Sequence, residues 1–200
     1  MSKKLYNITL ITLITILLIL LIRSILLQNY ENFIPVTTTI LTFFIPVVIE
    51  KIFKIEIPYS LKIFYIIYMF ISKFLGGDNF YYSTTPLYDK IIHAVYGIFS
   101  YIVSIFILVK FTTFNTKNIL FNIVFCLVIS LGTSVIWEFL EFFTDKVFLG
   151  NNQRLETGID DTMLDLIYTF VSTILLSVSY YIEVKFKKNW LIYRFVKMLN

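Results

Sequence analysis

Long apolar stretches limit what this chain can fold into. Six stretches, each about as long as a helix that crosses a bilayer, follow one another with only short connections: 5–27, 33–50, 58–75, 91–109, 118–141 and 162–183. These stretches and their connections use nearly all of the 200 residues. In lipid, a helix satisfies its own backbone hydrogen bonds. We therefore expect an all-α fold, an integral membrane bundle of six transmembrane helices that forms a single domain over residues 1–200.

The first stretch has one competing interpretation. Lys3 and Lys4 precede it, as basic residues precede the apolar core of a signal peptide. That core is usually about 7–15 residues long and is followed by a small-residue cleavage site, whereas this one is longer and has no such site. We predict a retained membrane span.

With 58 % hydrophobic and 15 % charged residues, the chain is too apolar for an ordinary soluble domain.

Basic residues are distributed unevenly around the stretches. If the spans alternate in direction, one side of the membrane carries most of them: Lys3, Lys4, Lys51, Lys54, Lys110, Lys117, Lys185, Lys187, Lys188, Arg194 and Lys197. The positive-inside rule then places both termini in the cytoplasm of a multi-pass plasma-membrane protein. The net charge of +4 follows from this topology, so we expect no nucleic-acid partner. The lipid bilayer is the expected partner, and the basic tail can also rest on anionic headgroups, although a topology signal is the simpler explanation.

Several residues predict local features of the helices. Pro46 lies inside the second stretch and predicts a kink there, whereas Pro58 stands where a helix can begin. The run Gly76–Asn79 predicts the end of the third stretch. The single cysteine, Cys126, lies among apolar neighbours and is expected to pack as a small hydrophobic residue.

Ionisable side chains inside membrane stretches are costly and mark functional sites by default. At the start of the fourth stretch, Asp89 and His93 are four residues apart and so share one helix face. Gly97 continues that face and allows a neighbouring helix to approach closely. His93 is the single histidine of the chain, and it is either a packed imidazole or part of a site.

Two more acidic groups lie near the fifth and sixth stretches. Three carboxylates at the end of the fifth share one sector of the helix: Glu138, Glu141 and Asp145. Glu138 and Glu141 are expected to point into the bundle, with Gly132 and Ser134 one turn deeper at a close helix contact, whereas Asp145 is expected beyond the membrane as a solvated charge.

At the start of the sixth stretch, Asp160 is explained as a helix cap. Asp165 lies one turn deeper and shares a face with Asp161.

Alternating topology brings these three groups to the outer leaflet. Carboxylates this close repel one another, so some are protonated or a cation lies among them. Oxygen ligands with one imidazole suit a divalent ion such as Mg²⁺, Mn²⁺, Ca²⁺ or Zn²⁺. The expected metal ligands are Asp89, His93, Glu138, Glu141, Asp161 and Asp165. Lys90 and Arg154 are the alternative source of positive charge, and they can also hold a phosphate.

The motifs that carry these residues resemble the YjdF-type family of bacterial membrane-spanning proteins of unknown function. They are YDKIIHAVYG at 88–97, WEFLE at 137–141, FLGNNQ at 148–153 and DTMLD at 161–165. The resemblance implies that the acidic residues and His93 act together. The pattern is more remotely similar to VanZ-like proteins. Glu141 stands where VanZ-like chains usually have Gln, and Thr169 and Ser172 stand where they have Asn and Gly, so a resistance activity is not carried over.

Three functions fit this sequence. The first is metal-assisted binding or hydrolysis of a lipid or cell-envelope intermediate, in which Glu141 or His93 moves a proton as the catalytic group. The second is a small transporter coupled to protons or cations. The inner half of the bundle, which we expect to be apolar, argues against it. The third is a non-catalytic scaffold in which the polar cluster ties helices together. The sequence leaves open whether the chain is an enzyme, and it leaves the oligomeric state open.

Overall fold

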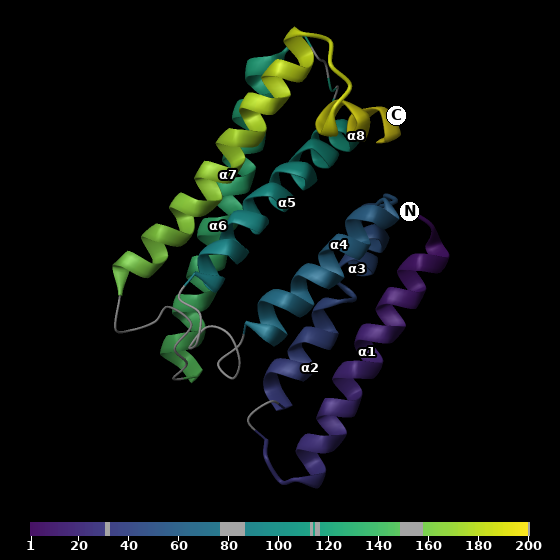
Figure 1. The fold of residues 1–200 in the computed structure, drawn as a ribbon, viewed down its shortest axis with the longest axis vertical. Helices are drawn as coiled ribbons and strands as arrows, with labels where there is room; N and C mark the ends of the chain where they lie inside the picture. Colours follow the sequence, from purple (N-terminus) through teal and green to yellow (C-terminus); the bar gives the residue numbers. More distant parts are fainter. Residues whose placement is uncertain (31–32, 77–86, 113, 115–116, 149–157, 200) are drawn as a thin grey trace. The chain divides into compact units, whose positions relative to one another are not determined.

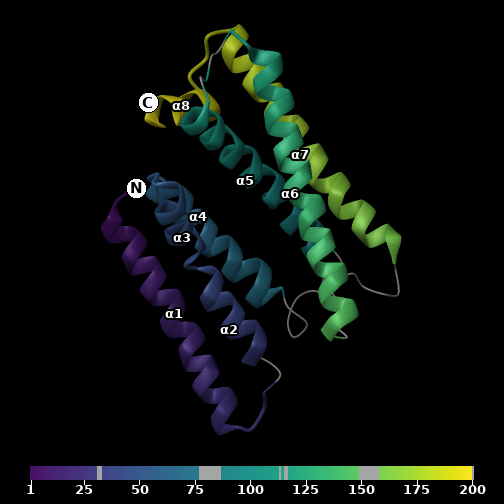
Figure 2. The same cartoon turned by 180° about the vertical axis from the view of Figure 1, so that it is seen from behind.

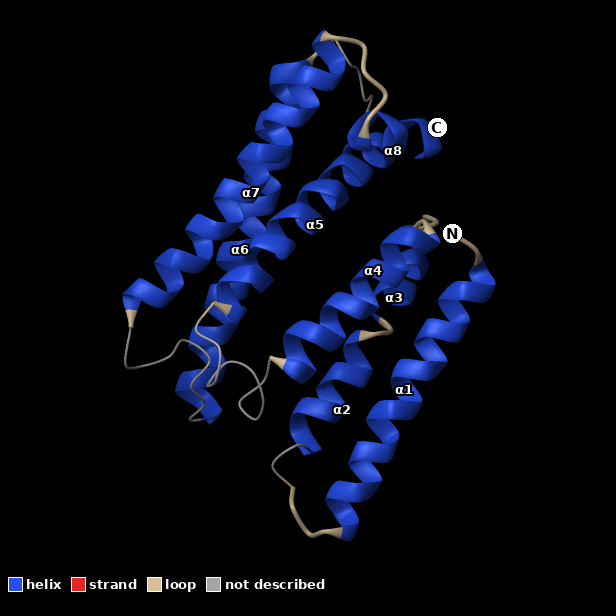
Figure 3. Ribbon diagram, in the orientation of Figure 1, coloured by secondary structure: helices blue, strands red, loops and turns tan. Residues whose placement is uncertain are grey.

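The computed structural model describes the chain except for residues 31–32, 77–86, 113, 115–116, 149–157 and 200. The described residues form helices and no strands (Figure 3). Their contacts divide the chain into two compact units, Met1–Pro86 and Leu87–Asn200. The all-α prediction is confirmed for these residues. That both units form one domain stays a prediction.

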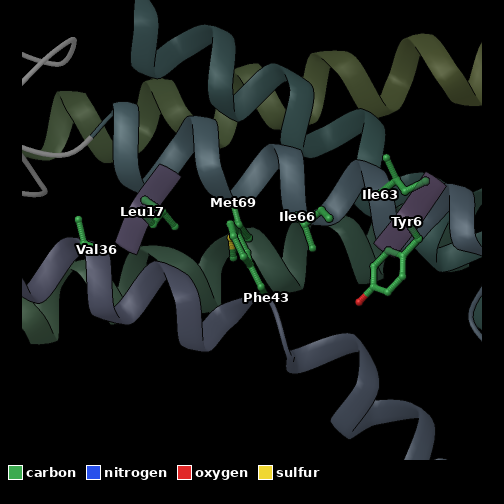
Figure 4. Close-up of a cluster of buried hydrophobic side chains, with 7 residues drawn as sticks. All are labelled: Tyr6, Leu17, Val36, Phe43, Ile63, Ile66 and Met69. Carbon is green, nitrogen blue, oxygen red and sulfur yellow. The ribbon is translucent and has the colours of Figure 1, made fainter. Parts of the chain in front are cut away.

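The first unit contains four α-helices and one π-helix. They are α1 (Lys3–Leu26), α2 (Phe33–Thr42), α3 (Ile45–Phe53), α4 (Tyr59–Met69) and η1 (Phe70–Leu75). Contacts join α1 to α2 and α4, and α2 to α4 and η1. Figure 4 shows the buried side chains at these contacts, which are Tyr6, Leu17, Val36, Phe43, Ile63, Ile66 and Met69. An apolar cluster therefore holds this unit together.

Pro46 interrupts the second predicted span, as expected from its missing backbone N–H. The chain leaves α2 after Thr42 and enters α3 at Ile45, so the proline lies in the first turn of a new helix. The interruption is a break between two short helices where the sequence predicted a kink.

An ion pair between the buried Lys62 and the partly buried Glu50, which the sequence analysis missed, connects α3 to α4. Lys62 Nζ lies 2.8 Å from Glu50 Oε1, and the same oxygen accepts the backbone N–H of Ile57 at 2.8 Å. The ammonium also lies 4.4 Å from the centre of the Tyr59 ring and 5.4 Å from that of Tyr6. These contacts compensate the burial of Lys62 by pairing and by cation–π attraction.

The second unit contains α5 (Tyr88–Phe111), α6 (Ile119–Phe148), α7 (Ile159–Lys185) and α8 (Leu191–Leu199). Figures 1 and 2 show α5, α6 and α7 side by side, with the short α8 beside the far end of α5. The contact between α5 and α7 is the most extensive of the unit. The sequence analysis predicted the three long helices and missed α8.

Glycines decide how closely the long helices approach. A Cβ added at Gly97 would lie 2.6 Å from the Thr169 carbonyl oxygen and would clash with Ser172 Oγ, so α5 and α7 need a glycine here. This confirms the prediction for Gly97. A Cβ added at Gly132 would have no atom within 4 Å, and Gly132 is exposed. Its predicted contact with a neighbouring helix is therefore wrong. For Ser134 the same prediction is confirmed, since Ser134 is buried and donates a hydrogen bond to Thr169 of α7.

In the part of the chain that the structure describes, five helical segments are long and apolar enough to cross a membrane: Lys3–Leu26, Phe33–Phe53, Tyr88–Phe111, Ile119–Val147 and Ile159–Lys185. They correspond to five of the six predicted spans. The third prediction, 58–75, falls on α4 and η1, which follow one another directly but together are shorter than these five.

The buried face of α7 is polar along its whole length. Each of its buried side chains carries a carboxylate or a hydroxyl: Asp161, Asp165, Thr169, Ser172, Thr173, Ser177, Tyr180 and Glu183. Several of these hydroxyls donate to the preceding turn of their own helix, as Ser177 does to the Thr173 carbonyl at 2.9 Å. The expectation that the inner half of the bundle is apolar is wrong, because side-chain polarity inside a bundle depends on which helix faces meet.

Candidate functional site

Acidic residues from three helices meet around Lys90 and His93 in the second unit. The first turns of α5 supply Asp89, Lys90 and His93, and the first turns of α7 supply Asp161 and Asp165. The last third of α6 adds its own carboxylates. A spacing of four residues puts Asp89 and His93 on one face of α5, and Asp161 and Asp165 on one face of α7. The close contact at Gly97 brings these two helix faces together.

Lys90 lies at the centre of the carboxylates. Its Nζ is 2.7 Å from Asp161 Oδ1, 2.8 Å from Asp165 Oδ1 and 3.0 Å from Asp89 Oδ2. An ammonium group has three N–H donors, so these three aspartates use all of them. Lys90 is thus the counter-charge that the sequence analysis named as an alternative to a metal.

His93 faces two of the same aspartates at longer distances. Its Nε2 is 3.7 Å from Asp89 Oδ1 and 3.8 Å from Asp165 Oδ1. Both distances exceed a hydrogen bond. His93 Nδ1 is buried and has no hydrogen-bond partner among the described residues. One ligand atom each from Asp89, His93 and Asp165 lies within 4.8 Å of the other two.

The two glutamates of α6 are placed differently. Glu138 is buried, and its Oε1 has no hydrogen-bond partner within the described parts of the chain. Glu141 is half-buried and accepts a hydrogen bond from Trp137 Nε1 at 2.6 Å. Neither glutamate belongs to the group of three ligand atoms, nor does Asp161. Three of the six expected metal ligands therefore come together in that group.

The remaining acidic and basic predictions have mixed outcomes. Asp160 is exposed in the first turn of α7, where an acid suits the helix dipole. Its predicted role as the helix cap is wrong, because the N-cap residue is Gly158 and no described side chain caps the helix. Asp145 was expected to be solvated, but only 7 % of it is exposed. That prediction is wrong because α6 continues to Phe148, and Asp145, seven residues after the buried Glu138, lies on the same buried face of the helix. Arg154 and most of the FLGNNQ motif lie outside the described residues.

Five carboxylates and one ammonium group leave the site short of positive charge. The carboxylates are Asp89, Glu138, Glu141, Asp161 and Asp165, and Lys90 can neutralise one of them. Ionised groups in a low-dielectric interior need partners. The remaining charge is balanced by protonation or by a further cation, and two carboxylates with an imidazole are ligands that several divalent metals accept.

A hydroxyl network holds the three helices together beside the cluster. Thr169 Oγ1 donates to the His93 carbonyl oxygen at 3.2 Å, and Ser134 Oγ donates to Thr169 Oγ1 at 3.3 Å. This network links α5, α6 and α7 one turn away from the carboxylates. The sequence analysis assigned Thr169 no such role, and its place one turn after Asp165 on the same face was the available signal.

The fold and the site together define a helical membrane protein, since five helical segments of the described residues are apolar enough to cross a bilayer and buried ionisable groups lie between three of them. The chain belongs to the family described as "Predicted membrane protein (DUF2238)", whose profile matches residues 8–185. The sequence expectation of a membrane-spanning protein of unknown function is confirmed at this level.

An uncharacterised protein of Thermotoga maritima is similar to this chain. The two are 34 % identical over 128 residues, which is 62 % of this chain and 64 % of the relative. The chain thus spans less than two thirds of that relative's length. No solved structure matches this chain.

Proposed function

We propose that Asp89, His93 and Asp165 bind a divalent cation within the membrane. The observation that carries this proposal is the group of three ligand atoms within 4.8 Å. His93 Nδ1 is buried without a partner among the described residues. If Nε2 binds the cation, Nδ1 would donate its proton to a water, as the second nitrogen of a metal-bound histidine often does. Glu138 Oε1 is a second buried polar atom without a partner among the described residues, although it does not belong to the group of three ligand atoms.

The proposed cation and Lys90 share one atom. Asp165 Oδ1 accepts from Lys90 Nζ at 2.8 Å and is also the Asp165 atom that faces His93 Nε2. Asp89 divides its oxygens, with Oδ2 toward Lys90 and Oδ1 toward His93. A cation between His93 and the two aspartates would therefore meet Lys90 as a neighbour of like charge.

The proposed reaction is metal-assisted binding or hydrolysis of a phosphate-bearing lipid or cell-envelope intermediate. A divalent cation held there would polarise a phosphoryl oxygen. Glu141, one turn from Glu138 on α6, would act as general base and take a proton from the water that attacks phosphorus, while the phosphorus–oxygen bond to the leaving alcohol or phosphate breaks. We also propose that the chain crosses a bacterial plasma membrane six times, with α4 and η1 as the third span. Both termini then lie on the cytoplasmic side. The site then opens to the outer leaflet.

The finer family assignment is also a proposal. The motifs around Asp89, Glu138 and Asp161 support a YjdF-type protein with a remote relation to VanZ-like proteins. No activity of either group is carried over to this chain.

Metal content and metal-dependent stability test the cation site. The full-length protein, purified without chelator, is expected to hold about one divalent ion per chain, and EDTA is expected to lower its Tm. His93→Ala should lose both properties, since it removes the nitrogen ligand. Asp160→Asn is the matched control. It removes an exposed acid from the first turn of α7, next to the buried Asp161, and should keep the bound metal and the effect of EDTA on the Tm.

Two results would contradict the cation site. One is a wild-type protein without bound metal whose Tm is unchanged by EDTA or by added Mg²⁺, Mn²⁺, Ca²⁺ and Zn²⁺. The other is a His93→Ala variant that keeps the metal. Variants that only lower stability would favour the scaffold function.

A second function, proton- or cation-coupled transport, is favoured by the polar face of α7. Buried hydroxyls and carboxylates follow this face from Asp165 near one end to Glu183 near the other, and such series carry protons or ions in membrane proteins. Proteoliposomes with the full-length protein would show proton or cation flux that Asp165→Asn abolishes. Absence of flux under a pH gradient and under a Na⁺ gradient would exclude this function.

A further inference from the structure

The C-terminal helix α8 and the basic segment before it form a surface that the cation site does not involve. We propose that this surface binds the headgroups of anionic phospholipids. The basic surface is defined here as Lys185, Lys187, Lys188, Arg194 and Lys197. Lipid binding by this surface goes beyond the proposed function, because such binding needs neither the metal nor a reaction.

Hydrogen bonds hold α8 at both of its ends. The carboxylate of Glu183 accepts the backbone N–H of Ile192 at 3.2 Å and that of Tyr193 at 2.7 Å. These are amides of the first turn, which have no partner inside the helix, and a carboxylate there also favours the helix dipole. At the other end, Lys110 Nζ donates to the Leu199 carbonyl oxygen at 3.3 Å. Glu183 is completely buried, so α8 is fixed to the bundle.

One face of α8 is buried in the bundle. Ile192, Val196 and Leu199, spaced four and three residues apart, are at most 9 % exposed. Ile192 and Val196 pack in one hydrophobic cluster with Tyr101 of α5 and Tyr180 of α7. This packing fixes the rotation of α8 about its own axis and so decides which side chains face away.

The other faces of α8 divide into an apolar and a basic sector. Leu191 and Met198, seven residues apart, lie on one flank and are both more than half exposed. Arg194 lies three residues after Leu191 and four before Met198, so it borders that flank, and Lys197 lies next to Arg194 on the same side; both are exposed. Apolar and basic sectors side by side are typical of a helix that lies in the membrane interface.

Exposed apolar side chains extend the surface before α8. Phe186 is 60 % exposed and Trp190 is 48 % exposed, and Lys187 and Lys188 lie between them. Large aromatic side chains are enriched at the level of the headgroups. The apolar groups therefore indicate contact with the bilayer, and the lysines between them meet the headgroup layer.

The net positive charge of the basic surface predicts which lipid headgroups it binds. Residues 184–200 contain no acidic residue, and the nearest acid in the sequence, Glu183, is buried and used by the amides of α8. The basic side chains thus have no acidic neighbour within their own segment. Anionic phospholipids attract such clusters, whereas zwitterionic lipids do not. The partner is thus an anionic phospholipid layer.

The test uses the full-length protein in nanodiscs that contain phosphatidylcholine and phosphatidylglycerol in equal amounts. Native mass spectrometry of the released protein counts the lipids of each kind that stay bound. The wild type is expected to retain phosphatidylglycerol in several-fold excess. The double variant Arg194→Gln/Lys197→Gln should lose most of this excess. Hydrogen exchange of the 191–199 amides should be slower in phosphatidylglycerol than in phosphatidylcholine for the wild type alone.

A second double variant, Lys3→Gln/Lys4→Gln, is the matched control. It removes the same charge from exposed positions in α1 and should keep the lipid excess. Equal retention of both lipids by the wild type would overturn the proposal. So would an equal loss in both double variants, since net charge would then explain it. A dimer mass that disappears with Arg194→Gln/Lys197→Gln would overturn it in favour of a second copy of the chain.

Discussion

Lys90 is the residue whose surroundings define the candidate site. Its ammonium group contacts aspartates from two helices within 3.0 Å, and all of these groups are buried. The attraction between close charges is strong in a low-dielectric interior, but it only compensates the cost of removing the charges from water. Lys90 is therefore both a structural partner of the aspartates and the positive charge nearest to the proposed cation.

Lys90→Gln is expected to strengthen divalent-cation binding while weakening the fold. Removing a like charge beside the cation should lower the metal Kd by about tenfold or more. In the absence of metal, breaking the buried ion pairs should destabilise the protein by about 3–5 kcal/mol. Titration of the apo protein with Mn²⁺ or Zn²⁺, followed by isothermal calorimetry and by Tm, measures both effects.

Lys62→Gln is the matched control for Lys90→Gln. Lys62 is as deeply buried as Lys90 and also pairs with an acid, Glu50, but it belongs to the first unit. It should lose stability without a change in metal Kd. An unchanged or raised Kd in Lys90→Gln would refute the competition at Asp165 Oδ1. Metal binding by neither protein would instead refute the cation site itself.

At the scale of elements, the contact between α5 and α7 depends on Gly97. A side chain there meets the Thr169 backbone and Ser172 Oγ, and backbone atoms of a packed helix cannot move aside cheaply. The same contact brings the Asp89–His93 face to the Asp161–Asp165 face. The site thus depends on a glycine two turns away from its carboxylates.

Gly97→Val is expected to separate α5 from α7. Overpacking typically costs about 1–3 kcal/mol, and here the obstacle is backbone, so we expect at least the upper end of that range. Gly132→Val on α6 should change stability by less than about 0.5 kcal/mol, because nothing lies within 4 Å of the added Cβ. Reversible unfolding in mixed micelles compares the two variants. Similar losses in both would show that the α5–α7 contact is not responsible, because helix propensity by itself favours valine over glycine.

The sequence predicted the long elements well and the short ones poorly. Its long apolar stretches match α1, α5, α6 and α7, because a lipid-exposed segment must be apolar over its whole length. It missed α8, whose nine residues mix apolar and basic side chains. It also missed the capping role of Glu183, since the amides that this carboxylate accepts belong to another element.

For the whole molecule, the path of the chain through the membrane depends on whether α4 and η1 cross it. Among the described residues, five helical segments qualify as spans by length and composition, and one of them consists of α2 and α3 together. If α4 and η1 also cross, Glu56 and Leu87 lie on opposite sides and both termini lie on one side. If α4 and η1 do not cross, Glu56 and Leu87 share a side.

Single cysteines in a Cys126→Ser background test this topology. We expect an impermeant maleimide to label Gln28→Cys and Leu87→Cys on intact cells, and to label Glu56→Cys and Lys188→Cys only after permeabilisation. The reason is that six alternating spans put the basic connections inside. Labelling of Glu56→Cys and Leu87→Cys from the same side would establish five spans and refute the sixth.

Much of this protein follows from the sequence alone. The apolar stretches require membrane helices, since the backbone has no other partner in lipid. The spacing of Asp89 with His93, and of Asp161 with Asp165, puts each pair on one face because the helix repeats every 3.6 residues. The cost of charge in lipid predicts that these faces point inward, and the structure buries all four residues.

Only the tertiary structure decided which of these faces meet. Contacts between helices depend on their rotation and separation, which the Gly97 approach sets and which no spacing along the chain reports. The structure therefore put Lys90 among three aspartates, left Glu141 with Trp137, and turned Gly132 outward. Distances between side chains from different helices arise from packing, and that packing selected Asp89, His93 and Asp165 from the acidic candidates.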